Sequence, residues 1–323
     1  MAAEPNPRLK PAALQPGDTI GVVAPASPFN RESFERSCEN LRRQGYKVLV
    51  PESVFGREAP YFAGTAEQRA HDLQEMFRNP EVRAIICARG GYGSNYLLGH
   101  IDLEVLRRAP KIFMGYSDVT ALLTWFHDAA GLVTFHGPMM NKDFASDDGV
   151  HATSLMAALG GASQWNLGSN AGLEALAPGE TEGNLYGGCL SILVASLGTP
   201  YEIHTAGTLL FLEDVAAKPY QIDRMLMQLK LAGKFHGVRG IIFGEMLDCR
   251  QSEDQAYKLQ DVVKRVVSDL GVPVAYGLRS GHVTHSNVTL PLGVRAALHV
   301  GAEASLTILE TATVPAAATA KTR

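Results

Sequence analysis

The chain has 323 residues, 46% of them hydrophobic, which exceeds what one hydrophobic core usually serves and predicts two cores. Its 29 basic and 33 acidic residues give a net charge of −4 without a dense basic run, which excludes a nucleic-acid partner. The four cysteines are scattered along the sequence, so we expect buried free thiols. The opening residues form no signal peptide and no apolar run is long enough to cross a bilayer. We therefore expect a cytoplasmic protein with no membrane partner.

The first half of the chain alternates predicted strands and helices. Asn30 and Thr65 are helix-capping residue types, and Thr65 with Gln68 predicts a capping box. Repeated strand-helix-strand units with short connections predict a doubly wound, mostly parallel sheet, in which sites lie beyond the carboxyl ends of the strands. The predicted elements are strands at residues 20–24, 47–50 and 84–88 and helices that begin after Asn30 and after Thr65.

A glycine-rich segment, with Gly90, Gly91 and Gly93, follows the predicted strand at residues 84–88. A dinucleotide-binding loop needs a third glycine where this chain has Tyr96, so that alternative is weak. Such a loop can instead bring a bare backbone N–H against a substrate carbonyl, as one half of an oxyanion hole. Either Gly90 or Gly91 could donate.

Ser117 lies where an apolar strand runs into a helix. A serine on such a turn exposes its hydroxyl, and the amides at the helix start, among them that of Asp118, point at an oxyanion formed beside it. The match to the hydrolase elbow is incomplete, because Val119 stands where a second glycine is usual. In the alternative interpretation Ser117 and Asp118 cap the helix. The segment is Lys111-Ile112-Phe113-Met114-Gly115-Tyr116-Ser117-Asp118-Val119-Thr120.

An acid and a base follow in the second half. Residues 208–212 predict a buried strand that ends at Glu213, and a glycine-rich loop carries His282. Serine needs a neighbouring histidine as base, and that histidine needs a carboxylate, so Ser117, Glu213 and His282 make a triad possible. Taken alone, Glu213 could be a solvated carboxylate at a strand end, and His282 a loop histidine without chemistry.

The domain prediction follows from where the pattern fades. Residues 141–180 show little periodicity apart from a helix at 154–159, which indicates a connection. We expect an α/β protein: a nucleophile domain at residues 8–140, a linker at 141–180, a smaller α/β domain at 181–310 that supplies acid and base, and a disordered tail at 311–323. The active site should lie at the domain interface. Predicted elements of the second half are strands at 208–212, 240–243, 272–276 and 305–309 and helices at 222–231 and 255–270.

The order and spacing of these segments resemble the LD-carboxypeptidase family, serine peptidases that include murein tetrapeptide carboxypeptidases and microcin C self-immunity proteins. The resemblance spans about residues 9–309. It implies Ser117 as nucleophile, Glu213 as acid and His282 as base, and the Gly-His pair favours His282 over His285. The matching segments include Val22-Val23-Ala24-Pro25-Ala26-Ser27-Pro28, Ala88-Arg89-Gly90-Gly91-Tyr92-Gly93, Gly115-Tyr116-Ser117-Asp118, Phe135-His136-Gly137-Pro138, Leu212-Glu213-Asp214-Val215 and Gly281-His282.

The resemblance also implies a reaction. The amide between an L-centre, L-lysine or meso-diaminopimelate, and C-terminal D-alanine of the murein tetrapeptide would be hydrolysed during cell-wall recycling. The oxyanion would lie on the amides of Gly91 and Asp118. A homodimer is implied, with no cofactor and no metal. Arg89 or Arg224 could bind the terminal carboxylate, although a structural ion pair or a hydrogen bond to nearby carbonyls is the simpler interpretation of each.

Three alternatives stay open. The same triad could cleave a peptidyl or aminoacyl nucleotide, which needs an aromatic platform for the base; Trp125 and Trp165 are more simply explained as core residues. A non-enzymatic nucleotide-binding module could rest on residues 90–93. Metal-dependent hydrolysis through His282 and His285 is the weakest, because no carboxylate-bearing helix motif accompanies them.

Overall fold

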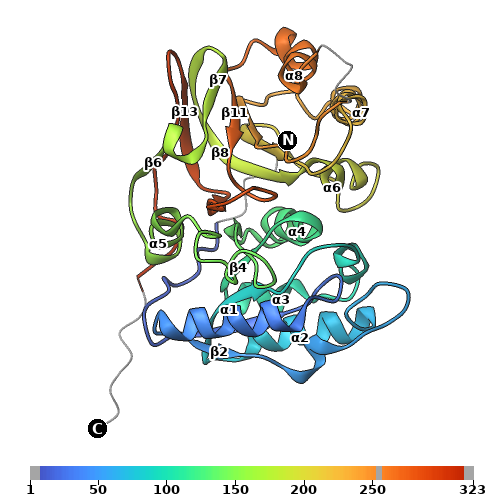
Figure 1. The fold of residues 1–323 in the computed structure, drawn as a ribbon, viewed down its shortest axis with the longest axis vertical. Helices are drawn as coiled ribbons and strands as arrows, with labels where there is room; N and C mark the ends of the chain where they lie inside the picture. Colours follow the sequence, from blue (N-terminus) through green and yellow to red (C-terminus); the bar gives the residue numbers. More distant parts are fainter. Residues whose placement is uncertain (1–7, 252–256, 316–323) are drawn as a thin grey trace.

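Two β-sheets, each with its own helices, organise the chain (Figure 1). The structure is a computed structural model that describes residues 8–251 and 257–315. Within those residues the first sheet has six strands, and neighbours run parallel except β12 against β5. Their spatial order is β12 (Leu290–Leu292), β5 (Thr134–His136), β4 (Ile112–Gly115), β3 (Val82–Cys87), β1 (Thr19–Val23) and β2 (Lys47–Leu49). The predicted doubly wound sheet is confirmed.

Two helices of this half, α1 and α2, begin where the capping residues predict them. The Ser33 amide donates to the Asn30 side chain at the start of α1, and the Gln68 amide donates to Thr65 at the start of α2. The Gln68 side chain instead donates to Asp72, so one half of the predicted capping box forms. The helical elements are α1 (Arg31–Arg43), α2 (Ala66–Arg78), α3 (Leu103–Arg108) and α4 (Thr120–Ala130), with short 3-10 turns η1 (Glu52–Phe55), η2 (Ser94–Leu97) and η3 (Ser117–Val119).

The second sheet has eight strands among the described residues, with four parallel strands, β8 to β11, at its centre. In spatial order they are β6 (Trp165–Leu167), β14 (Ala304–Ile308), β13 (Arg295–Val300), β8 (Gly179–Cys189), β9 (Thr208–Glu213), β10 (Gly240–Gly244), β11 (Val274–Leu278) and β7 (Glu174–Ala177). Its helices are α6 (Leu190–Ala195), α7 (Pro219–Leu231) and α8 (Leu259–Val267), followed by η5 (Ser268–Leu270). The predicted strands of this half fall on β9, β10, β11 and β14. The helix predicted from residue 255 begins outside the described residues.

Two segments differ from their predicted roles. Residues 141–180, expected as a connection, carry α5 (Ala152–Gly160) and η4 (Ser169–Ala171), and also β6 and β7, which form the two edges of the second sheet. Residues 311–315, expected in a disordered tail, pack against the body: Ala312 and Thr313 are buried, and Val314 forms a parallel bridge with Ala12. The rest of that expected tail, residues 316–323, lies outside the described residues.

The two sheets share a hydrophobic core, which positions the site. Phe113 and Phe135 of the first sheet belong to the same buried cluster as Leu209 and Phe211 of the second. α4 lies between the two sheets and contacts β8 and α6 (Figure 1). A second cluster fills the space between the second sheet and α6 to α8.

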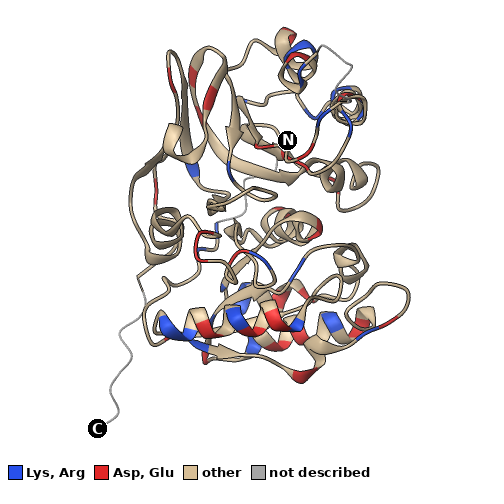
Figure 2. Ribbon diagram, viewed as in Figure 1, with Lys and Arg blue, Asp and Glu red and all other residues tan. Residues whose placement is uncertain are grey.

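Basic and acidic residues are interspersed along α1 and α2, as Figure 2 shows. Of the helices that the structure describes, none combines the length and apolar character needed to cross a membrane.

Candidate active site

Ser117 occupies a sharp turn between β4 and α4. Its φ of 63° lies in the left-handed region, which side-chain-bearing residues rarely adopt and which costs about 1 kcal/mol or more. Neither η3 nor α4 receives a side-chain cap, so Ser117 does not cap the helix. The Asp118 carboxylate accepts a hydrogen bond from the Ser94 amide at 2.7 Å instead. The Ser117 hydroxyl is thus not used as a helix cap and is free to bind another side chain as its partner.

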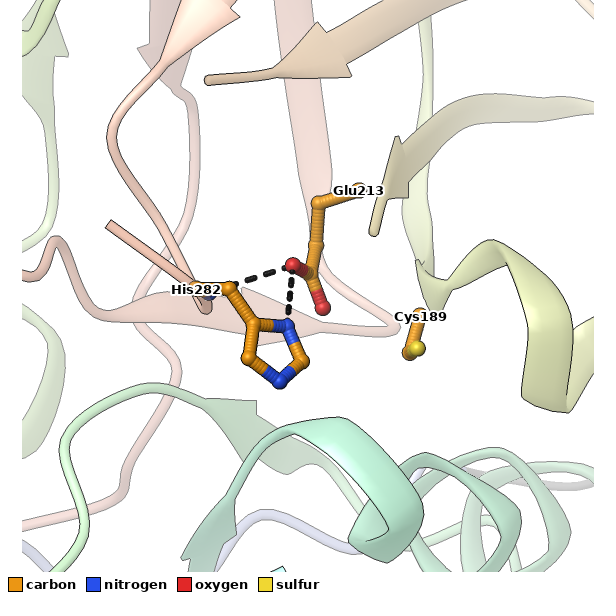
Figure 3. A group of neighbouring side chains, drawn as sticks. All are labelled: Cys189, Glu213 and His282. Carbon is orange, nitrogen blue, oxygen red and sulfur yellow. Dashed lines mark hydrogen bonds and ion pairs between the residues drawn. The ribbon is translucent and has the colours of Figure 1, made fainter. Parts of the chain in front are cut away.

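That partner is His282, in the loop after β11. The distance from His282 Nε2 to Ser117 Oγ is 3.0 Å, and the distance from His282 Nδ1 to Glu213 Oε2 is 2.8 Å. The same Glu213 oxygen accepts the backbone N–H of His282 at 3.1 Å, as the two dashed lines in Figure 3 show. Because Nδ1 donates to a carboxylate, the lone pair of Nε2 faces the serine. The structure therefore brings Ser117, His282 and Glu213 together in one hydrogen-bonded chain.

Electrostatics keep the acid charged. Burial of Glu213 alone would raise the pKa of its carboxyl, but His282 and His136 outweigh that effect and lower the pKa to about 2. Burial also pulls the pKa of His282 down, and the Glu213 carboxylate outweighs it, so the pKa of His282 lies above its ordinary value. An ionised Glu213 can stabilise the imidazolium that forms when His282 takes a proton from serine.

A glycine permits the close approach of acid and base. Gly281 has a φ of 94°, and a Cβ there would lie 2.6 Å from Glu213 Cδ. The buried Asn287 side chain accepts from the Gly281 N–H at 2.9 Å and donates to the Gly281 carbonyl at 3.1 Å. The glycine of the Gly-His pair thus leaves room for the acid beside the base, whereas the contacts of Asn287 with Gly281 gave no sequence signal.

The glycine-rich loop lies against the nucleophile. A Cβ on Gly90 would be 3.0 Å from Ser117 Oγ and 3.3 Å from the Asp118 amide nitrogen. Gly91 has a φ of 102°, and a Cβ there would lie 2.5 Å from Ser27 Oγ, which accepts the next amide, that of residue 92, at 3.1 Å. Bare backbone therefore borders the space beside the serine hydroxyl and the Asp118 amide, where an oxyanion could be held.

The other predicted residues lie apart from this chain of hydrogen bonds. His285 is exposed near Asp148. Arg89 is exposed and donates to the Pro28 carbonyl at 2.7 Å, and Arg224 on α7 stacks over Tyr220 at 5.4 Å. Trp125 lies 5.5 Å from the ring of Tyr201, and Trp165 lies on β6 at the edge of the second sheet.

Two neighbours of the acid were not predicted. His136, at the end of β5, is fully buried, and its Nε2 lies 3.8 Å from Glu213 Oε1. Its motif, Phe135-His136-Gly137-Pro138, was visible in the sequence without a role. The second neighbour is Cys189, which Figure 3 shows on the side of Glu213 away from His282.

Cys189, Glu213 and His282 each offer a possible metal ligand, and these atoms lie within 4.8 Å of one another. Both ring nitrogens of His282 are already engaged by Glu213 and Ser117. Burial raises the pKa of the Cys189 thiol well above its ordinary value, which disfavours the thiolate that a metal needs. The three residues therefore fit nucleophilic catalysis by serine better than a metal centre.

Two protein-family profiles match the chain: the LD-carboxypeptidase N-terminal domain over residues 20–137 and the LD-carboxypeptidase C-terminal domain over residues 182–298. The probable murein peptide carboxypeptidase of Bacillus subtilis is 40% identical over 294 residues, covering 90% of this chain and 91% of that protein.

Solved structures agree with the profiles. MccF in complex with glutamyl sulfamoyl guanosine matches with a TM-score of 0.87 at 26% identity, over 95% of this chain and 100% of that one. The muramoyltetrapeptide carboxypeptidase from Oxalobacter formigenes matches with a TM-score of 0.80 at 29% identity, over 91% and 99% of the two chains. The chain belongs to the LD-carboxypeptidase family and is a serine-type carboxypeptidase.

Proposed function

We propose that this carboxypeptidase releases C-terminal D-alanine from murein tetrapeptide, with Ser117 as nucleophile, His282 as base and Glu213 as acid. The observation that carries the proposal is the hydrogen-bonded chain, 3.0 Å from His282 to the serine hydroxyl and 2.8 Å from His282 to the carboxylate. The murein peptide named for the Bacillus subtilis relative supports this class of substrate.

The reaction follows from the geometry. His282 Nε2 takes the Ser117 proton while Oγ attacks the carbonyl carbon, and the carbonyl oxygen becomes an oxyanion on the amides of Asp118 and Gly91. His282 then gives its proton to the D-alanine nitrogen as the C–N bond breaks, which leaves an acyl-serine. Water, activated by the same histidine, hydrolyses the ester and restores the hydroxyl.

The terminal carboxylate of the substrate needs a cation. We assign this role to Arg89, which directly precedes the glycine-rich loop beside the nucleophile and whose guanidinium is exposed. Arg224 is the weaker choice because it lies on α7 and stacks over Tyr220.

A second function, cleavage of an aminoacyl or peptidyl nucleotide by the same residues, has one observation in its favour. Four aromatic rings gather next to the glycine-rich loop, with neighbouring ring centroids 4.9 to 6.0 Å apart. Three of them, Tyr61, Tyr92 and Tyr96, are 40 to 50% exposed and could stack on a nucleobase. The fourth is Phe62. The MccF structure contains such a nucleoside ligand.

The deciding experiment offers both substrate classes to the purified enzyme. It is incubated with the L-lysine and diaminopimelate tetrapeptides and with an aminoacyl adenylate, and free D-alanine and free amino acid are measured by mass spectrometry. The murein proposal predicts D-alanine release that Ser117→Ala abolishes. Cleavage of the adenylate alone would favour the second function, and nucleotide binding without any hydrolysis would favour a binding module.

We further propose that the enzyme acts in cell-wall recycling as a cytoplasmic homodimer, as the family resemblance implies. Light scattering coupled to size-exclusion chromatography should then give twice the 34.7 kDa mass of the chain. A single-chain mass across the working concentration range would contradict the dimer.

A further inference from the structure

The acid of the proposed triad has an oxygen that the triad does not use. Glu213 Oε2 binds His282 twice, whereas Oε1 is buried and accepts no hydrogen bond from the described residues. The Nε2 atom of His136 is also buried and has no hydrogen-bond partner among the described residues, and it lies 3.8 Å from Glu213 Oε1. Unpaired buried polar atoms are costly, so two that face each other call for an explanation.

The other nitrogen of His136 reveals where its protons are. Ser280 Oγ lies 2.8 Å from the Val288 carbonyl, which can only accept, so the single hydroxyl proton is donated there. Ser280 Oγ must then accept from His136 Nδ1, at 2.9 Å, and Nδ1 therefore carries a proton. A neutral ring would consequently point the lone pair of Nε2 at a carboxylate oxygen. A second proton on Nε2 turns this repulsion into attraction.

We propose that His136 is an imidazolium that pairs with Glu213 Oε1 and acts as a positioning residue for the acid. The inference rests on the triad proposed above, to which it adds a fourth member. The pair joins the two sheets, since His136 comes from β5 and Glu213 from β9.

Aromatic rings and backbone surround the pair, whose side chains are 0% and 1% exposed. The Phe211 ring lies 5.2 Å from the His136 ring in an edge-on arrangement, and the Tyr116 ring lies 6.2 Å away. A Cβ at Gly281 would be 2.8 Å from His136 Cε1, so no side chain separates the loop from the ring. The titratable and charged groups that the described residues place near His136 and His282 include Glu213, Asp214, Cys189, Tyr116 and Lys142.

The pairing has a consequence for the base. The Glu213 carboxylate raises the pKa of His282 against the effect of burial. An imidazolium on the far oxygen offsets part of that negative charge, so the pKa of His282 is raised less than it would be beside an unpaired carboxylate. Glu213 thus keeps its orienting hydrogen bonds while its effect on the pKa of His282 is moderated.

The first test is the pH profile of kcat/KM for His136→Gln, a neutral side chain that can still donate to Ser280. Loss of the positive charge should move the acidic limb to higher pH by about one unit, with most of the activity retained at the alkaline plateau. The matched control is His127→Gln: His127 is a half-buried histidine of the same half of the chain, but its Nδ1 contacts the Leu132 carbonyl, and its replacement should leave the limb in place. An unchanged or lowered limb in folded His136→Gln would overturn the proposal.

The second test needs no activity. Nitrogen chemical shifts of ¹⁵N-histidine-labelled enzyme at neutral pH should show both ring nitrogens of His136 protonated, with the signals assigned by their loss in His136→Gln. If that variant does not fold, the Nδ1 signal is assigned by its displacement in Ser280→Ala. One unprotonated nitrogen would show that the ring is neutral and refute the inference, even if no tetrapeptide is cleaved and the proposed function fails.

Discussion

The two histidines of one loop differ in their contacts, and single substitutions should separate them. His282→Ala should lower kcat about 10³-fold or more, as much as Ser117→Ala, because the members of a triad act as a unit. His285→Ala should cost at most a few-fold, since its side chain is exposed. Glu213→Gln should fall in between, because the base keeps its place but loses its anionic partner. Turnover of the preferred tetrapeptide measures all four.

Circular dichroism of each variant provides the control for folding. A folded His282→Ala enzyme with near-normal turnover, beside an inactive His285→Ala, would transfer the role of base to His285.

The backbone of Ser117 supports a separate prediction about stability. Alanine keeps the unfavourable φ of 63° and glycine relieves it, so Ser117→Gly should be more stable than Ser117→Ala by about 1 kcal/mol, although both are inactive. Urea denaturation of the two variants measures this difference. Equal stabilities would mean that the turn holds no strain.

Single functional residues could be predicted from the sequence where the residue type itself indicates a catalytic role. Ser117, Glu213 and His282 could be picked out because a nucleophile, an acid and a base followed predicted strands or glycines. His136 and Asn287 could not, because their roles depend on partners distant in the chain: His136 meets Ser280 across 144 residues. No local pattern encodes such a contact.

Among the elements, the glycine-rich loop after β3 should tolerate substitution least. A methyl group at Gly90 would fall 2.8 Å from Ser117 Cβ and would fill the space where a substrate carbonyl must approach the hydroxyl. Gly90→Ala should therefore lower kcat/KM at least about 100-fold, as expected when an oxyanion site is blocked. Steady-state kinetics on the tetrapeptide measure the loss.

Gly99→Ala is the matched control for this loop, because the nearest atom to a Cβ there is 4.0 Å away, at Tyr201. It should retain near-normal kinetics. Activity of Gly90→Ala equal to that of Gly99→Ala would place the substrate carbonyl elsewhere.

Elements with strong local signals were predicted well. α1 and α2 have capping side chains and one apolar face, and β3 and β9 each contain a continuous apolar run, at residues 84–87 and 209–212. β6 and β7 escaped prediction because they are edge strands of three and four residues, partly exposed, and therefore too short to show periodicity. Their pairing with β14 and β11 comes from the tertiary fold.

For the whole molecule, the buried Glu213 between the two sheets predicts how the free energy of unfolding changes at low pH. The pKa of Glu213 is about 2 in the folded state, against an ordinary value of 4.5. The ionised carboxylate therefore adds its full contribution to the free energy of unfolding above pH 4.5, and this contribution is lost as the pH falls toward 2. Because Glu213 faces His136 across the two sheets, that loss should loosen their docking.

Glu213→Gln provides the comparison for this prediction. The free energy of unfolding, measured by urea titration across the same pH window, should fall more steeply for the native enzyme than for Glu213→Gln. Parallel curves would mean that the ionisation of Glu213 does not couple to folding.

The pairing of β12 with β5 determines when the first sheet can be completed during synthesis on the ribosome. Residues 290–292 pair with residues 134–136, so the edge strand of the first sheet is translated long after the other five. The nucleophile emerges 165 residues before its base, which at about 5–20 residues per second is a wait of about 10–30 s. During that interval the nascent chain carries a serine without its base, so peptide-bond cleavage has to wait until His282 has been translated and has reached Ser117.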